Sequence, residues 1–383
     1  SRVCYNDGKI TGGAVPPLFT VHFFLIISIG GTAMKYLFKN GTVVSGRGTR
    51  RADVLVENEK ILQVGRNLSD PLARAIDVTG KLLMPGFIDA HTHFDLDVCN
   101  TTTADDFDSG TKSAIRGGTT TIVDFACPNK GESLHHGLDL WHRKADGKCW
   151  CDYGFHMTID DWNAEIEKEI DDMYAAGISS FKMYMTYPAM MIGDEAMYKA
   201  LKKLKEKGGI CGVHCENSGV INALIEEKKA AGEMGVSSHP ETRPDFLEAE
   251  AVSRLLRIAQ AVDIPVVIVH LTNAATLAEV TAARRRGQKV YVETCPQYLV
   301  LDDSVYYNED FSRAARYVCA PPLRRRIAGL CGPACVRATS RPSPRTTAPL
   351  PWRRRTPAGA TLPRSPGACP GWKLGVSWCT PSA

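Results

Sequence analysis

The sequence predicts an α/β protein, namely a TIM-type (β/α)8 barrel preceded by a small β-sandwich domain. From residue 87 onward, strand-like and helix-like segments alternate, which is the pattern of parallel β/α units. Histidines and a lysine lie at or near the ends of several strand-like segments, and such barrels gather functional side chains at the carboxyl ends of their strands. Short apolar runs broken by Gly and Asn precede residue 85 and predict the small β domain.

The composition is that of a chain that can bury a large core, with 383 residues, 44% hydrophobic and 23% charged. The formal net charge is +4, but residues 311–383 hold twelve Arg, one Lys and no Asp or Glu, so the preceding residues are net acidic. We therefore expect no nucleic-acid partner for the body of the protein. Thirteen scattered cysteines, an odd number, indicate a reducing cytoplasm rather than a disulfide framework.

Three close cysteine pairs are open to two interpretations, a metal site or buried thiols. The pairs are Cys149/Cys151, Cys211/Cys215 and Cys331/Cys335. None of them forms the doubled Cys-x-x-Cys set of a structural zinc site, so we predict buried thiols.

The first 33 residues are interpreted as a translated upstream leader or a disordered segment. The chain begins at Ser1, and we expect Met34 to be the true start. An apolar run at residues 17–29 is too short to span a bilayer, and it lacks the basic leader and the small-residue cleavage site of a signal peptide. We therefore expect no membrane partner.

Residues 34–85 are predicted to form the small β domain. Alternating apolar runs at residues 36–38, 53–56 and 60–64 have the pattern of hairpin strands, and Asn40-Gly41 follows the first of them as a break. Pro85-Gly86 ends this region.

Residues 86–325 are predicted to form the barrel, with seven of its eight strands. The strand candidates are residues 87–93, 120–125, 153–159, 180–185, 210–214, 265–271 and 289–294. Helical patterns between them include residues 161–176, 194–207, 218–231, 246–261 and 274–286.

Two histidines one residue apart, His91 and His93, end the first strand candidate. Side chains alternate along a strand, so both histidines point the same way and can bind one metal ion. The alternative is a pair of exposed histidines in a polar loop. The apolar residues that precede them, and the histidines at the ends of later strands, favour the metal site.

His214 and His270 lie at the ends of the fifth and sixth strand candidates, although each taken alone could instead hydrogen-bond a backbone carbonyl. Lys182 lies in the fourth strand, where an ammonium that faces the barrel interior carries a large desolvation cost unless it is paired or modified. His156, in the third strand, is predicted to be a packed polar residue. The remaining histidines are placed in leader or loop positions: His22, His135, His136, His142 and His239.

Several short motifs accompany these candidates. They are residues 84–93 (MPGFIDAHTH), 103–107 (TADDF), 117–120 (GGTT), 180–185 (SFKMYM), 214–217 (HCEN), 239–240 (HP), 242–244 (TRP), 269–271 (VHL) and 293–298 (ETCPQY). Their order and spacing resemble the dihydropyrimidinase and D-hydantoinase family of cyclic amidohydrolases over about residues 35–325. The segments at 103–107 and 293–298 favour this branch over the neighbouring dihydroorotases and allantoinases.

The resemblance implies a site with two zinc ions. It assigns the first zinc to His91 and His93 and the second zinc to His214 and His270. Lys182, once carbamylated by carbon dioxide, would bridge both ions. The implied reaction is hydrolysis of the ring amide of a dihydropyrimidine or hydantoin to an N-carbamoyl amino acid.

Two further residues are implied to lie at the substrate. Tyr187 matches the family tyrosine that hydrogen-bonds the substrate and the developing oxyanion. Ala320 occupies the position of a serine that usually precedes the paired prolines near the substrate, so a contact there would come from backbone groups. The resemblance also implies a homotetramer.

The last metal ligand of the family is an aspartate at the end of the eighth strand, and no Asp or Glu follows Asp310 in this sequence. Residues 326–383 are instead rich in Arg and Pro, and we interpret them as the product of a frameshift or truncation. A disordered nucleic-acid-binding tail is the alternative. We therefore expect this copy to be poorly soluble and inactive or nearly so.

A non-catalytic scaffold or interaction protein is the alternative function. Relatives of that kind resemble the enzymes in fold but lack the metal histidines. Because this chain retains all of the histidine positions, hydrolysis is the preferred function.

Overall fold

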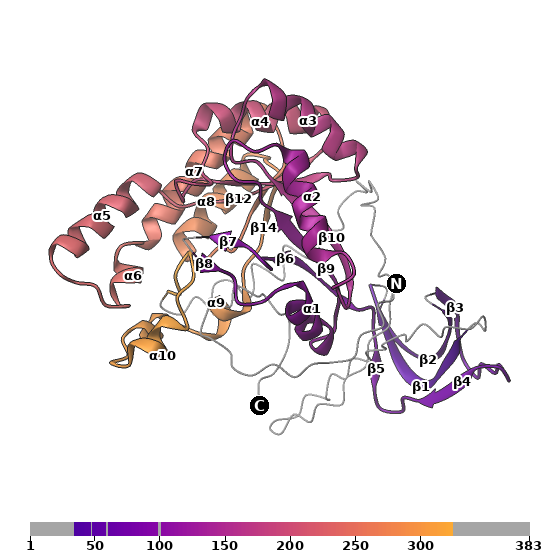
Figure 1. The fold of residues 1–383 in the computed structure, drawn as a ribbon. Coiled ribbons are helices and arrows are strands. Elements are labelled where there is room, and N and C mark those ends of the chain that lie inside the picture. The colour runs from indigo at the N-terminus through magenta and orange to yellow at the C-terminus, as the bar shows by residue number, and fades with distance from the viewer. Residues whose placement is uncertain (1–33, 47, 59, 99–100, 325–383) are drawn as a thin grey trace.

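The computed structural model describes residues 34–324, apart from residues 47, 59 and 99–100. The predictions for residues 1–33 and 326–383 lie outside these described residues. Figure 1 shows a small sheet formed by β1–β5 beside a larger α/β body. Within the described ranges, no helix combines the length and the apolar character needed to cross a membrane.

The small sheet contains five strands in the order β3-β2-β1-β4, and β5 also pairs with β1. The strands are β1 (Lys35–Ser45), β2 (Gly48–Glu57), β3 (Lys60–Gly65), β4 (Arg74–Asp77) and β5 (Leu82–Leu83). Its buried side chains form a separate small core that consists of Tyr36, Phe38, Val54, Val78 and Leu83. The predicted small β domain is thus present.

Asn40 and Gly41 lie inside β1 rather than at its end. The pairing of β1 with β2 shifts register between Phe38 and Gly41, and Asn40 has a φ of 65°. A Cβ atom on Gly41 would lie 2.2 Å from Leu83 Cδ1, so only glycine lets the strand approach the small core this closely. The interruption expected from the sequence is therefore a bulge within one continuous strand.

The larger sheet contains seven parallel strands in the order β14-β13-β12-β11-β10-β9-β6. The strands are β6 (Phe87–Thr92), β9 (Thr119–Ala126), β10 (Asp152–Thr158), β11 (Ser180–Tyr184), β12 (Ile210–His214), β13 (Val266–Ile268) and β14 (Val290–Val292). Each strand coincides with a predicted one, which confirms the β/α alternation and the TIM-type fold class. Because the strands run parallel, their carboxyl ends share one rim.

Helices lie between these strands in the chain and after β14, and α5, α6 and α10 project away from the sheet (Figure 1). They are α1 (Phe107–Arg116), α2 (Leu134–Ala145), α3 (Ala164–Ala175), α4 (Asp194–Glu206), α5 (Ser218–Ala230), α6 (Ser238–Glu241), α7 (Asp245–Val262), α8 (Ala274–Arg285), α9 (Pro296–Val300), η1 (Asp303–Tyr306) and α10 (Phe311–Ala315). The five helices predicted individually are confirmed as α3, α4, α5, α7 and α8. A short two-stranded ribbon, β7 (Asp97–Val98) and β8 (Thr101–Thr102), follows β6.

Three histidines that were predicted to lie in loops, namely His135, His136 and His142, lie on α2. Ser133 caps this helix by accepting a hydrogen bond from the His136 N–H, and Trp141 is buried on its inner face. The loop prediction was wrong because the polar histidines obscured the helical spacing of the apolar residues.

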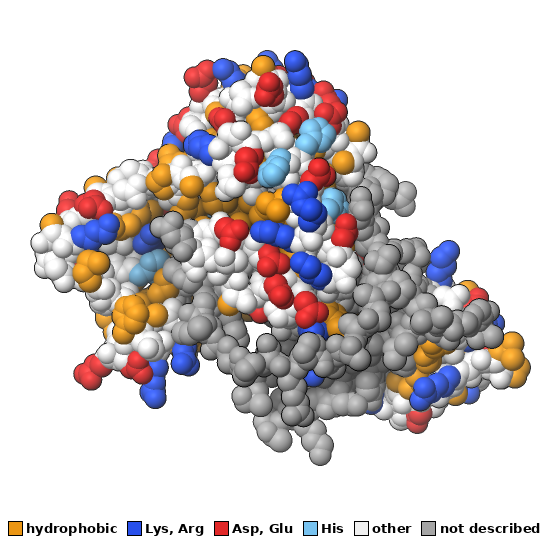
Figure 2. Space-filling view, viewed as in Figure 1, with side chains coloured by type: hydrophobic (Ala, Val, Ile, Leu, Met, Phe, Trp, Pro, Cys, Tyr) orange, Lys and Arg blue, Asp and Glu red, His pale blue; other side chains and the backbone are white. Residues whose placement is uncertain are grey.

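The cysteine pairs within the described residues are buried free thiols, as predicted: Cys149, Cys151, Cys211 and Cys215. They belong to the large hydrophobic core of the α/β body. Cys331/Cys335 lies outside the described residues. On the face shown in Figure 2, acidic and basic side chains are interspersed over the α/β body.

Candidate functional site

The carboxyl ends of four parallel strands bring the five predicted ligands together. His91 lies in β6, and His93 directly follows that strand. Lys182 lies in β11, His214 is the last residue of β12, and His270 lies two residues beyond β13. All five line one cavity of about 190 Å³.

The imidazole rings of the four predicted histidine ligands lie against one another. His91 Nε2 is 3.2 Å from His93 Nε2. The ring centroids of His214 and His270 are 4.4 Å apart, and those of His91 and His270 are 5.6 Å apart. Burial lowers the pKa of each of the four, so the rings are neutral at neutral pH, the state that metal coordination requires.

Lys182 is the most unusual residue in the cavity. Its side chain is 0% exposed, and its Nζ makes no hydrogen bond with any described residue. The Nζ lies 4.7 Å from the Phe125 ring centroid and 4.8 Å from that of Tyr184. Desolvation lowers the pKa of Lys182 to about 8, which makes the neutral amine accessible near neutral pH.

Two carboxylates fix the orientation of two of the histidines. Glu293 Oε2 accepts a hydrogen bond from His91 Nδ1 at 2.7 Å, and Glu216 Oε2 accepts one from His214 Nε2 at 2.7 Å. Each bond leaves the opposite ring nitrogen as the one available for a metal. Glu216 lies in the HCEN motif and Glu293 in the ETCPQY motif, but the sequence alone did not assign either acid a role.

The donor set fits a metal centre. His270 Nδ1 and Lys182 Nζ are buried atoms without a hydrogen-bond partner among the described residues. In that part of the chain no three His, Cys, Asp or Glu side chains are by themselves arranged to hold a metal ion, and no Asp or Glu lines the cavity. An oxygen-bearing ligand at Lys182 would add to this set, because Lys182 lines the same cavity as the histidines.

The two residues implied at the substrate also line the cavity. Tyr187 has a φ of 66°, and its ring centroid is 5.1 Å from that of His214. Ala320 lies on the cavity wall next to the paired prolines. Apolar side chains that include Leu96 and Met190 supply more of the wall, so a ring would be held in largely apolar surroundings.

Two other histidines have different environments. His239 lies on α6 and not in a loop, and its side chain lines the cavity. Its Nε2 donates a hydrogen bond to the Cys319 carbonyl at 2.7 Å, and its Nδ1 accepts one from Arg243 at 3.2 Å. The loop prediction for His239 was wrong because a four-residue helix has too few residues to show a period. His156 Nε2 lies 2.9 Å from the Ala90 carbonyl, and this histidine is a packed polar residue, as predicted.

Comparisons with known proteins match the amidohydrolase family over residues 82–351. D-hydantoinase of Streptomyces coelicolor is 41% identical over 295 residues, which are 75% of this chain and 63% of that relative. Dihydropyrimidinase of Dictyostelium discoideum is 40% identical over 294 residues, 75% of this chain and 58% of that relative. The crystal structure of dihydropyrimidinase from Brevibacillus agri superposes with a TM-score of 0.75 at 42% identity, over 76% of this chain and 64% of that chain.

The chain thus spans less than two thirds of the length of these relatives. The family match nevertheless covers more than half of this chain, and it includes all the strands of the parallel sheet. The fold and the order of the motifs agree with this match. The chain belongs to the amidohydrolase family, in the branch of the D-hydantoinases and dihydropyrimidinases.

Proposed function

We propose that this protein is a zinc-dependent hydrolase that opens the cyclic amide of dihydropyrimidines or hydantoins to give N-carbamoyl amino acids. The observation that carries the proposal is the amine of Lys182, which is buried without a hydrogen-bond partner among the described residues and shares one cavity with the four histidines proposed as ligands. Relatives named D-hydantoinase and dihydropyrimidinase are 40–41% identical, and a solved dihydropyrimidinase shares the fold, which supports this choice of reaction.

Two zinc ions are assigned to the cavity, one to each histidine pair. His91 and His93 would hold the first, since their Nε2 atoms face each other at 3.2 Å. His214 and His270 would hold the second, since their rings are in contact. The hydrogen bond from His214 Nε2 to Glu216 leaves Nδ1 of His214 for the metal. Zinc supplies Lewis acidity at such a site, which lowers the pKa of water and polarises a carbonyl group.

Lys182 would join the two pairs after carbamylation. Its neutral amine attacks the carbon of carbon dioxide, forms an N–C bond and releases one proton, which leaves an anionic carbamate with two oxygen donors. The pKa of about 8 favours this step, because an ordinary lysine is almost entirely protonated at neutral pH. Carbamylation also replaces a buried amine that lacks a partner with oxygen ligands that suit zinc.

Tyr187 is assigned to the substrate. Its phenolic O–H would donate to the ring carbonyl oxygen as negative charge develops there, and its place beside His214 puts this donor at the second histidine pair. Leu96 and Met190 would exclude water from around the ring. At Ala320 the contact with substrate would come from the backbone.

The test uses the full chain supplied with zinc and ¹³C-bicarbonate. We expect a carbamate carbon signal in the ¹³C spectrum, zinc that stays bound through gel filtration, and only slow opening of dihydrouracil or hydantoin, above the uncatalysed rate but close to inactivity, because no Asp or Glu of the described residues lines the cavity as the final metal ligand. Lys182→Ala should abolish all three results. Lys199→Ala removes an exposed lysine on α4 and should change none of them. A protein that retains no zinc, or that binds zinc without a carbamate on Lys182, would contradict the proposal.

The alternative function, a non-catalytic scaffold, predicts that the protein binds no zinc. The same metal analysis therefore tests it. We further propose a cytoplasmic location, which the buried free thiols of the described residues support. A homotetramer is proposed from the family resemblance, and sedimentation of the purified protein measures it.

A further inference from the structure

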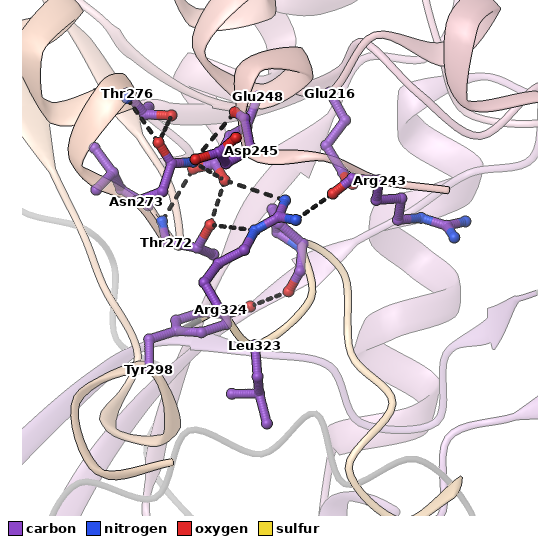
Figure 3. Close-up of polar contacts among 12 residues, drawn as sticks. Glu216, Arg243, Asp245, Glu248, Thr272, Asn273, Thr276, Tyr298, Leu323 and Arg324 are labelled. Atoms are coloured by element: carbon purple, nitrogen blue, oxygen red, sulfur yellow. Dashed lines mark hydrogen bonds and ion pairs between the residues drawn. The ribbon is translucent and has the colours of Figure 1, made fainter. Parts of the chain in front are cut away.

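Arg324 connects three separate segments through a buried guanidinium (Figure 3). Its side chain is 11% exposed. Its Nη1 donates to the Arg243 carbonyl, its Nε lies 3.5 Å from Thr272 Oγ1, and its Nη2 lies 4.0 Å from Glu248 Oε2. Burial of a charged side chain with these polar neighbours indicates that its position is fixed by the surrounding structure.

Glu248, on α7, joins Arg324 to the segment that carries His270. This carboxylate is 2% exposed and accepts hydrogen bonds from the Thr272 N–H at 3.0 Å, from the Thr272 hydroxyl, and from the Asn273 side chain at 2.8 Å. Asn273 in turn caps α8. The turn that follows His270 is therefore held between α7, α8 and Arg324.

Glu216 contacts His214, and in Figure 3 its side chain points toward the guanidinium of Arg324. It is 1% exposed, and its Oε2 accepts the hydrogen bond from His214 Nε2 while its Oε1 has no hydrogen-bond partner among the described residues. Burial raises the pKa of Glu216, but the hydrogen bond with His214 and the charges of His214, Arg243 and Arg324 lower it further than burial raises it. Arg324 thus supplies positive charge to a buried acid that orients a proposed metal ligand.

We propose that Arg324 is a positioning residue for the His214 and His270 half of the metal centre. The guanidinium compensates the buried carboxylate that orients the His214 ring, and its contacts with Thr272 and Glu248 fix the backbone turn that follows His270. This inference rests on the proposed function only in taking these two histidines as a zinc pair. The other pair is oriented independently, because Glu293, at the end of β14, holds His91.

The first measurement uses metal-free, full-length protein labelled with ¹⁵N-histidine. The Nε2–H of His214 should give a slowly exchanging resonance, identified by its loss in His214→Gln. Arg324→Met should speed the exchange of this proton at least tenfold, and Arg324→Lys should restore part of the protection. Arg254→Met, which removes a more exposed arginine paired with Asp194, should leave the resonance unchanged.

The second measurement follows zinc transfer to a chelator. Arg324→Met should raise the dissociation constant of one zinc equivalent by about tenfold to a hundredfold and leave the other unchanged. Glu216→Gln should raise the dissociation constant of the same zinc equivalent. The double variant should lose no more zinc affinity than the single variant with the larger loss. Glu293→Gln should affect the other equivalent.

An unchanged His214 resonance in folded Arg324→Met would overturn the inference. Losses of zinc affinity in Arg324→Met and Glu216→Gln that add up in the double variant would also overturn it. If Arg324→Met does not fold, Arg324→Lys is compared with wild type in its place, and equal exchange rates and zinc affinities would overturn the inference. Absence of zinc from every variant would refute the proposed function, and the His214 resonance of metal-free protein would still decide the role of Arg324.

Discussion

Tyr187 holds a backbone conformation that few residues with a side chain adopt. Its φ is 66°, a left-handed conformation that must be held by the surrounding structure. Such conformations are common at functional sites. We predict that Tyr187→Phe, which keeps the ring but removes the hydroxyl, lowers kcat on the order of a hundredfold with little change in zinc content. Steady-state kinetics on dihydrouracil measures this effect. An equal loss from Tyr198→Phe, an exposed tyrosine on α4, would show that the effect is unspecific.

Asp160 makes stability depend on pH at a point outside the cavity. It is 2% exposed, its Oδ2 has no hydrogen-bond partner among the described residues, and burial raises its pKa to about 6 from the ordinary 3.8. The folded protein keeps this proton to a higher pH than the unfolded chain does, so the free energy of unfolding falls between about pH 4 and pH 6 and stays lowered above that range.

We therefore predict that Asp160→Asn removes this fall and gains about 2 kcal/mol in the free energy of unfolding at pH 7. Urea unfolding measured from pH 4 to pH 7 tests the prediction. A variant whose stability keeps the pH slope of the wild type would show that the Asp160 carboxyl is not the titrating group.

The place of the proposed ligands in the fold could be predicted from sequence, whereas their hydrogen-bond partners could not. His91 and His214 end apolar strand segments, and that position alone places them at the rim of a parallel sheet. Glu293 is 202 residues from His91 in the chain, so their contact depends on the curvature of the whole sheet. Glu216 is only two residues from His214, but spacing does not reveal that its carboxylate turns back to the ring.

At the scale of elements, the bulge in β1 is set by one glycine. A Cβ atom on Gly41 would meet Leu83 Cδ1 at 2.2 Å and Val78 Cγ2 at 2.9 Å, whereas one on Gly46 would meet nothing within 4 Å. We predict that Gly41→Ala destabilises the protein by about 1–3 kcal/mol through overpacking of the small core. Gly46→Ala is the matched control and should cost far less. Chemical unfolding of both variants measures the difference, and equal losses would mean that the small core absorbs the extra methyl group.

Strands were predicted more completely than helices for a physical reason. Buried parallel strands are nearly continuous apolar runs, and β13 is an example that the sequence alone identifies. The helix α2 interleaves polar histidines with its buried residues, and its start depends on a cap at Ser133 rather than on periodicity. The bulge at Gly41 could not be predicted either, because Asn-Gly indicates turns and bulges alike.

At the scale of the whole molecule, the candidate site joins the two edges of the parallel sheet. Among the described residues, β6 and β14 are the outermost strands. Glu293 directly follows β14 and accepts the hydrogen bond of His91 in β6 at 2.7 Å. The sheet therefore curves far enough for its edges to meet at the carboxyl rim, which is the curvature of a barrel. The proposed metal centre and the closure of the sheet thus depend on the same side chains.

This dependence predicts that Glu293→Ala loosens the two edge strands of metal-free protein. A hydrogen bond to a charged group contributes about 1.5–3 kcal/mol, so amide exchange in β6 and β14 should speed up roughly tenfold or more while β11 and β12 stay protected. Glu216→Ala removes the same kind of carboxylate from a histidine in the middle of the sheet, and it should leave β6 and β14 unchanged. Hydrogen exchange followed by mass spectrometry resolves these segments. If exchange rises equally in all seven strands, Glu293 stabilises the molecule globally, and the edges are joined by other contacts.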